Sequence, residues 1–121
     1  MARYVDGFVM IVKKKDLKAY QKMARQGAKL WKKYGALEYV ECLGHDLHGK
    51  NVMFPFTKLA RTKPSEVVVF SWIVYKSKAQ RDAINAKVMN DPSMAPENFK
   101  GPMPFDMKRS ANGGFKVIVE A

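Results

Sequence analysis

The sequence contains a single cysteine, Cys42, half as many acidic as basic residues, and no long apolar run. One cysteine excludes an intramolecular disulfide, and small secreted domains usually need several, so a reducing compartment and a cytoplasmic location are expected. The apolar stretch near the N-terminus ends at Val12, before three lysines, which is too short and wrongly placed for a signal peptide. No stretch approaches the roughly 20 apolar residues of a membrane span, so no membrane segment is predicted.

Motifs of several enzyme classes are also absent. There is no glycine-rich phosphate loop, nucleophile elbow or zinc-protease motif. Cys42, His45 and His48 lie close together with Asp46, and these residue types can bind zinc. His45, Asp46 and His48 fall in a glycine-flanked loop rather than on a rigid element, which favours a solvated loop. The sequence therefore predicts neither a metal nor a cofactor.

The 121 residues and 47% apolar composition are typical of one folded domain, residues 1–121, with a substantial core. Hydrophobic periodicity predicts strands at 4–12, 36–43, 66–75 and 115–120, and helices at 17–34 and 77–89. Residues 44–65 are expected to form a loop with an irregular edge strand near 52–56. Residues 107–111 are expected to be extended, and Asn112-Gly113-Gly114 to form a turn or bulge. This order predicts an α+β fold, the ferredoxin-like βαββαβ sandwich, with an antiparallel sheet and both helices on one face.

The predicted strands are apolar on both sides. In Val67 to Tyr75 both alternating registers are apolar, whereas a sheet with one face in water should alternate apolar and polar residues. The face away from the helices must therefore also be hidden. The chain's own loops are too short and too polar to cover it, so we expect a homodimer that pairs through the sheet face.

Several segments closely resemble the YbaA-like family of bacterial proteins of unknown function, over nearly the whole chain. They are Tyr4 to Phe8, Gly35 to Cys42, Val69 to Tyr75, Asn85 to Met89, Met103 to Asp106, Lys108-Arg109 and Gly113 to Phe115. The resemblance implies the dimeric α+β barrel superfamily, in which two ferredoxin-like subunits pack their sheets together. It brings no established activity, but the superfamily includes cofactor-free monooxygenases and small-molecule-binding proteins, which implies a pocket between sheet and helices. The chain departs from the family pattern at Met107, where glycine is common, and in its strong basic charge.

Candidate pocket residues are polar groups within apolar strands and aromatic side chains on them. Asp6 lies inside the first strand and Arg109 before the last, so the two are candidates to pair, more plausibly as a structural ion pair than a catalytic one. The aromatic candidates are equally typical of plain core. The full set of pocket candidates is Asp6, Tyr39, Phe70, Ser71, Trp72 and Arg109. The leading hypothesis is binding of a small apolar molecule or a cofactor-free oxygenase; whether the chain is an enzyme stays open.

A second hypothesis follows from the net charge of +11. One face of the first helix carries only basic residues within an arc of roughly 100°. Such a face could bind RNA or DNA, but no known nucleic-acid motif accompanies it and no aromatic residues are interleaved for base stacking. A solvated helix face is therefore the favoured interpretation. The residues are Lys18, Lys22, Arg25, Lys29, Lys32 and Lys33.

Overall fold

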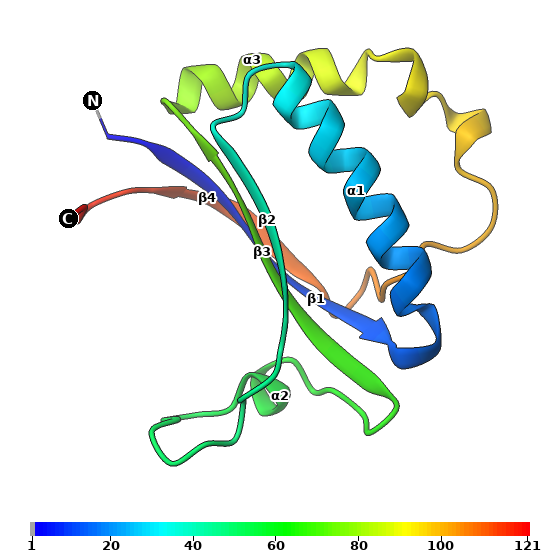
Figure 1. Cartoon of the computed structure of the whole chain (residues 1–121), viewed down its shortest axis with the longest axis vertical. Helices are drawn as coiled ribbons and strands as arrows, with labels where there is room; N and C mark the ends of the chain where they lie inside the picture. The colour runs from blue at the N-terminus through cyan, green and yellow to red at the C-terminus, as the bar shows by residue number, and fades with distance from the viewer. Residues whose placement is uncertain (1) are drawn as a thin grey trace.

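The computed structural model describes residues 2–121 and confirms the ferredoxin-like α+β fold (Figure 1). The strands are β1 (Tyr4–Lys13), β2 (Glu38–Leu43), β3 (Glu66–Tyr75) and β4 (Ala111–Lys116). The helices are α1 (Leu17–Lys33), α2 (Phe56–Leu59) and α3 (Lys78–Met89), with short 3₁₀ turns at Lys14–Asp16, Pro92–Met94 and Pro96–Asn98.

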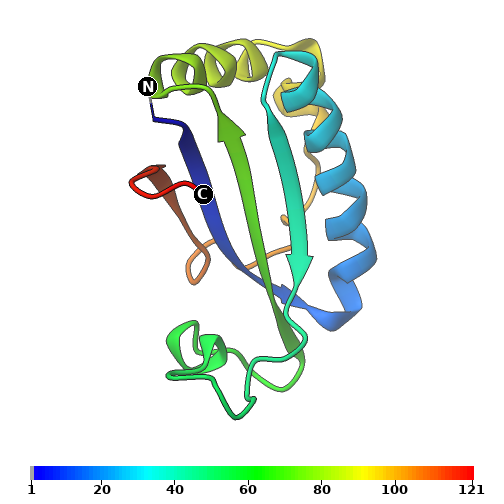
Figure 2. The same ribbon diagram turned by 60° about the vertical axis from the view of Figure 1, so that its left-hand side comes forward.

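The four strands form one antiparallel sheet in the order β2-β3-β1-β4. The two central strands are the longest, and they are rich in the β-branched and aromatic residues that favour strands. Helices α1 and α3 cover one face of the sheet, which we call the covered face (Figures 1 and 2). Within residues 2–121 no helix packs along the opposite face, which we call the open face.

Local signals in the sequence explain where the long helices begin and end. Gly35 follows α1 with φ of +108°, a conformation that glycine adopts without a Cβ clash. At the start of α3 the Ser77 hydroxyl accepts a hydrogen bond from the Gln80 amide at 3.1 Å. The Gln80 side chain in turn accepts from the Lys76 amide, so the two side chains satisfy amides that the helix leaves without partners.

The core lies between the covered face and the two helices, in two clusters. One centres on Tyr75 and Ile84, and the other on Val12 and Tyr20. Both clusters join a central strand to a helix, so burial of these side chains fixes the helices on the sheet.

The last strand differs from the prediction. It spans Ala111–Lys116 rather than 115–120, and Asn112, Gly113 and Gly114 lie inside it, opposite Phe8, Gly7 and Asp6 of β1. A Cβ on Gly114 would lie 2.3 Å from the Arg81 Nη2 atom and 2.4 Å from the Tyr4 hydroxyl oxygen. The glycine therefore marks a close approach of side chains to the strand and not a turn.

The edge strand predicted near 52–56 is wrong as well. Pro55 instead precedes the short helix α2, and residues between β2 and β3 otherwise form loop and turns. This segment extends past one end of the sheet toward the open side (Figures 1 and 2). It touches the open face through Phe56, whose ring centroid is 6.2 Å from that of Phe70.

Candidate functional site

The sheet separates the candidate residues onto its two faces. Ser71 packs under the helices and is 4% exposed, whereas its neighbours Phe70 and Trp72 point to the open face because side chains alternate along a strand. Asp6 and Tyr39 lie on the covered face. These residues therefore do not line one common pocket between the sheet and the helices, contrary to what the resemblance implied.

Two tyrosines and a glutamate form a polar cluster under α1. The Tyr20 and Tyr39 hydroxyls donate hydrogen bonds to the two carboxylate oxygens of Glu41, at 2.7 and 3.0 Å. Burial, reinforced by Glu41, raises the pKa of both hydroxyls far above the usual value for tyrosine. A Cβ on Gly27 of α1 would lie 3.0 Å from the Tyr39 hydroxyl oxygen, so glycine here makes room for the cluster. Its tight packing and paired groups are those of a satisfied buried network.

Asp6 belongs to a second network under α3. Its carboxylate accepts a hydrogen bond from the Tyr75 hydroxyl at 3.0 Å and lies 3.3 Å from the Arg81 guanidinium. Arg81 also donates to the Tyr4 hydroxyl at 3.2 Å. Burial and the Asp6 charge together raise the pKa of Tyr75. The pairing of Asp6 with Arg109 considered from the sequence is wrong. Asp6 pairs with Arg81 of α3, and Arg109 pairs with Glu66.

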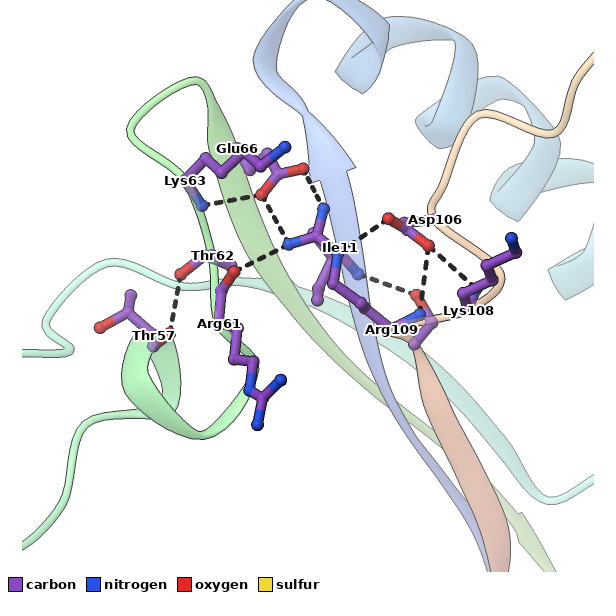
Figure 3. Close-up of polar contacts among 10 residues, drawn as sticks. Ile11, Thr57, Arg61, Thr62, Lys63, Glu66, Asp106, Lys108 and Arg109 are labelled. Atoms are coloured by element: carbon purple, nitrogen blue, oxygen red, sulfur yellow. Dashed lines mark hydrogen bonds and ion pairs between the residues drawn. The ribbon is translucent and has the colours of Figure 1, made fainter.

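Arg109 is the centre of a third polar cluster, at the other end of β1 (Figure 3). Its guanidinium forms a two-pronged pair with the Glu66 carboxylate and donates to Asp106 at 2.8 Å and to the Arg61 carbonyl at 2.8 Å. Hydrogen bonding to Arg109 holds the pKa of the Glu66 and Asp106 carboxyls below their usual values. All three guanidinium nitrogens donate to groups of the same chain, so we assign Arg109 a structural role.

Residues 106–110, just before β4, are hydrogen-bonded to β1 beside the same cluster. The Asp106 amide donates to the Ile11 carbonyl at 2.8 Å, and the Ile11 amide donates to the Ser110 hydroxyl at 3.0 Å. Asp106 also accepts from the amides of Lys108 and Arg109. We call these contacts, with Glu66, the Arg109 clamp.

The open face carries a surface hollow, an apolar groove of about 510 Å³. Its floor contains Gly7 and Gly113, which have no side chain, and larger residues stand around them. Phe70 is 44% exposed and Phe115 is 61% exposed. The Trp72 indole NH donates to Glu38 at 2.7 Å, beside the groove. The lining residues are Val5, Gly7, Phe8, Val9, Phe70, Trp72, Ala111, Asn112, Gly113 and Phe115.

The remaining candidates lie on the surface. His48 is exposed and hydrogen-bonds Thr57 at 2.6 Å, and residues 2–121 contain no group of three or more His, Cys, Asp or Glu able to hold a metal. All six basic residues on α1 are exposed. Lys32 donates to the Leu37 carbonyl at 3.0 Å and Lys33 pairs with Asp91 at 3.3 Å, which leaves four without such contacts in this part of the structure.

Sequence reasoning missed Tyr20, Glu41 and Arg81 as members of polar networks. Glu41 offered the same signal as Asp6, because it is an acidic residue within an otherwise apolar strand. Its tyrosine partners and Arg81 carried no comparable signal, since each sits in a helical or strand pattern that is explained by periodicity alone.

The architecture is that of a ferredoxin-like protein, and comparison with known proteins agrees. A solved structure described as a dimeric ferredoxin-like protein from an uncultured marine organism superposes with a TM-score of 0.63 over 100% of both chains, at 13% sequence identity. That likeness concerns the fold alone. Among the helices of residues 2–121, none has the length and apolar character to cross a bilayer.

The chain belongs to the family described as protein of unknown function DUF1428, which matches residues 3–107. Its curated relatives include the uncharacterized protein YbaA of Escherichia coli strain K12 and of Shigella flexneri. Each is 45% identical over 118 residues, which cover 98% of both chains. The YbaA-like resemblance is thus confirmed, and these relatives are bacterial proteins without an assigned activity.

Proposed function

We propose that this chain is a homodimeric protein that pairs through its open sheet face and holds a small, mainly apolar molecule in the groove there. The observation that carries the proposal is the groove of about 510 Å³ on a face that the chain leaves uncovered. Ligand sites typically occupy about 300–1,000 Å³ and are lined mostly by apolar side chains with a few polar groups. Asn112 and the Trp72–Glu38 pair are the polar groups beside this groove.

Dimerisation is supported by the amount of apolar side chain that the open side exposes. Besides Phe70 and Phe115, the segment around α2 exposes Phe54 (63%), Phe56 (41%) and Leu59 (68%). Soluble monomers rarely expose contiguous apolar surfaces of this kind. The solved ferredoxin-like neighbour is described as dimeric, which fits the same arrangement. The second copy would roof the groove and exclude water from its contents.

The proposed setting follows from the composition. A single domain, residues 1–121, with one partly buried cysteine fits the reducing cytoplasm. No reaction is part of the proposal, because the polar groups that line the groove lack an acid–base pair.

Oligomeric state tests the pairing. Light scattering after size-exclusion chromatography should give twice the 13.8 kDa of the chain. Phe70→Lys and Phe115→Lys place like charges across the proposed contact and should yield monomers. Met89→Lys is the matched control, because Met89 is 57% exposed at the end of α3 on the helix side. A monomeric wild type, or dissociation by the control alone, would refute pairing through this face.

Filling the groove tests ligand binding separately. A Cβ on Gly113 meets no heavy atom within 4 Å, so Gly113→Val should fold normally and occupy the groove. With 1-anilinonaphthalene-8-sulfonate as the reporter, we expect the wild-type dimer to enhance its fluorescence. The variant should bind the dye at least about fivefold more weakly, because the valine side chain removes apolar contact between the dye and the groove. Equal binding by both proteins, with dimers intact, would reject the ligand site and leave the dimer standing.

A further inference from the structure

The largest charged feature of the molecule is not used by the groove or by a dimer that pairs through the open face. Of the 22 basic residues, nine fall within residues 13–33, where Asp16 is the only acidic residue. They line the start and the outer side of α1. We call Lys18, Lys22, Arg25 and Lys29, together with the lysines at 13, 14 and 15, the basic ridge.

The basic ridge is not neutralised by the rest of the chain. All seven of its side chains are exposed, and within residues 2–121 none lies within 4 Å of a carboxylate oxygen. Some other basic residues are paired with an acid, namely Lys33, Lys78, Arg81 and Arg109. Nine basic residues and one acidic residue give residues 13–33 a net charge of +8 out of +11 for the chain, and such a concentration of positive charge attracts polyanions.

The spacing of the ridge suits a regular row of phosphates. Its four helical members recur at steps of three and four residues, so neighbouring charges stand about 5–6 Å apart. Lys18 and Lys29 are separated by about 16 Å along the helix axis at 1.5 Å per residue. One strand of a nucleic-acid duplex places a phosphate at about every 3.4 Å of axis, so the helical part of the ridge spans about five phosphates.

The ridge ends in a hollow. Lys13, Lys14, Lys15 and Ser65 line a surface depression of about 430 Å³ beside the beginning of α1. The amide dipoles at a helix N-terminus add positive potential to that of the lysines. A phosphate group can therefore approach three ammonium groups at one end of the row.

The surroundings of the ridge favour a nucleic acid over a membrane. An interfacial helix binds a bilayer by inserting an apolar face, but that face of α1 is directed to the core through Tyr20 and Ala24, both buried. No large apolar residue of residues 13–33 is among the exposed ones. The ridge has no aromatic side chains to stack on unpaired bases, which favours a duplex over a single strand.

We propose that the basic ridge binds the phosphate backbone of duplex nucleic acid without sequence preference. The interaction is electrostatic: four to seven cations replace condensed counterions along one strand, and no base edge is contacted. Because α1 lies on the side of the sheet opposite the open face, this binding is compatible with the proposed dimer, which would present one ridge on each outer side.

A neutralised variant with a charge-matched control tests the proposal. Lys18→Gln, Lys22→Gln, Arg25→Gln and Lys29→Gln together remove the helical part of the ridge while keeping good helix formers. The control combines Lys50→Gln, Lys76→Gln, Lys87→Gln and Lys100→Gln, all exposed positions away from the ridge. Each variant lowers the net charge of +11 by four. Circular dichroism and thermal unfolding should match the wild type for both.

Fluorescence anisotropy would be measured with labelled DNA and RNA duplexes of about 20 base pairs of mixed sequence, between about 50 and 200 mM salt. We expect micromolar binding at low salt, a slope of log K against log salt of about −4 or steeper, at least tenfold weaker binding by the ridge variant, and less than twofold change in the control. DNA and RNA arms identify which duplex is preferred. Equal weakening by the control, a slope shallower than about −2, no binding at about 100 μM, or tighter binding to vesicles containing phosphatidylglycerol than to either duplex would overturn the proposal.

Discussion

The two faces of the sheet solve the problem of burial in different ways. On the covered face, polar side chains are frequent and the tyrosine hydroxyls donate to acids: Tyr20 and Tyr39 to Glu41, and Tyr75 to Asp6. The buried Arg81 Nε atom lies 3.3 Å from Asp6 without a hydrogen bond. On the open face the groove is almost entirely apolar, and Phe70 and Phe115 remain exposed. A face that the chain covers itself can afford polar groups because their partners are supplied in the same fold. A face left for another occupant is apolar, since any unpaired polar group would weaken association.

The largest test of this comparison is a pair of truncations in β3. Ile73 is 4% exposed on the covered face, and Ile73→Ala should lower the free energy of unfolding by about 3 kcal/mol through lost burial and a cavity. Phe70→Ala on the open face should cost less than about 1 kcal/mol when the protein is dilute, with a further loss that grows with protein concentration. Urea unfolding across protein concentrations measures both. Similar, concentration-independent losses would erase the distinction between the faces.

The next test removes one hydroxyl. Tyr75→Phe leaves Asp6 without its tyrosine donor in a buried setting, and we expect a loss of about 1–2 kcal/mol in the free energy of unfolding. The matched change on the open face is Glu38→Ala, which removes the acceptor of the Trp72 indole; water replaces it, so the loss should stay under about 0.5 kcal/mol. Thermal and urea unfolding give both values. A greater loss from Glu38→Ala than from Tyr75→Phe contradicts the comparison.

Two adjacent glycines of β4 allow a finer test. Gly114→Ala would push a methyl group into Arg81 and Tyr4 on the covered side, and should cost about 1 kcal/mol because the shift disturbs the Arg81–Asp6 pair. The contacts are the end of the flexible Arg81 side chain and the outer edge of the Tyr4 ring, and both can shift, so the variant should still fold. Gly113→Ala meets nothing within 4 Å and should be neutral or slightly stabilising. Chemical unfolding of the two variants side by side decides; the reverse order would mean the register of β4 differs.

The smallest expected effect is one of pH on the Arg109 clamp. The pKa values of Glu66 and Asp106 are lowered by hydrogen bonds to Arg109, so both carboxylates stabilise the fold above their unfolded pKa values near 4. That stabilisation is lost as pH falls below about 4, through the lowered folded pKa values. Urea midpoints at neutral pH and at about pH 3 should therefore differ, and Glu66→Gln should shrink the difference while Glu97→Gln, an exposed acid outside the clamp, should not. An unchanged acid response in Glu66→Gln would contradict this account.

Much of the fold was accessible from the sequence because the periodicity of the long elements agrees with their burial. Both central strands, α1 and α3 were predicted within a few residues, and the two-sided apolar pattern of β3 anticipated the open face. The position of β4 could not be predicted from the sequence. Gly113 and Gly114 have the composition of a turn, and the reason for Gly114, the approach of Arg81 and Tyr4, comes from residues far away in sequence.

The candidate site was predicted less well for the same reason. Alternation along β3 places Phe70 and Trp72 opposite Ser71, so residues that are adjacent in sequence cannot share one pocket. The choice of partner for Asp6 depended on the orientation of α3, which brings Arg81 to it, while Arg109 is held by Glu66. Side-chain pairing across elements is decided by packing geometry, which local patterns do not encode.

The Arg109 clamp also makes the position of β4 independent of the length of the chain that precedes it. Because Asp106 and Ser110 bond to the main chain of Ile11, the alignment of β4 beside β1 is set by these contacts and not by how many residues lead up to them. Residues 99–103, between the second 3₁₀ turn after α3 and the clamp, should therefore tolerate insertions and deletions without sliding the final strand. Variation in length among related proteins is accordingly expected to gather in that stretch, with Asp106 and Arg109 as its fixed boundary.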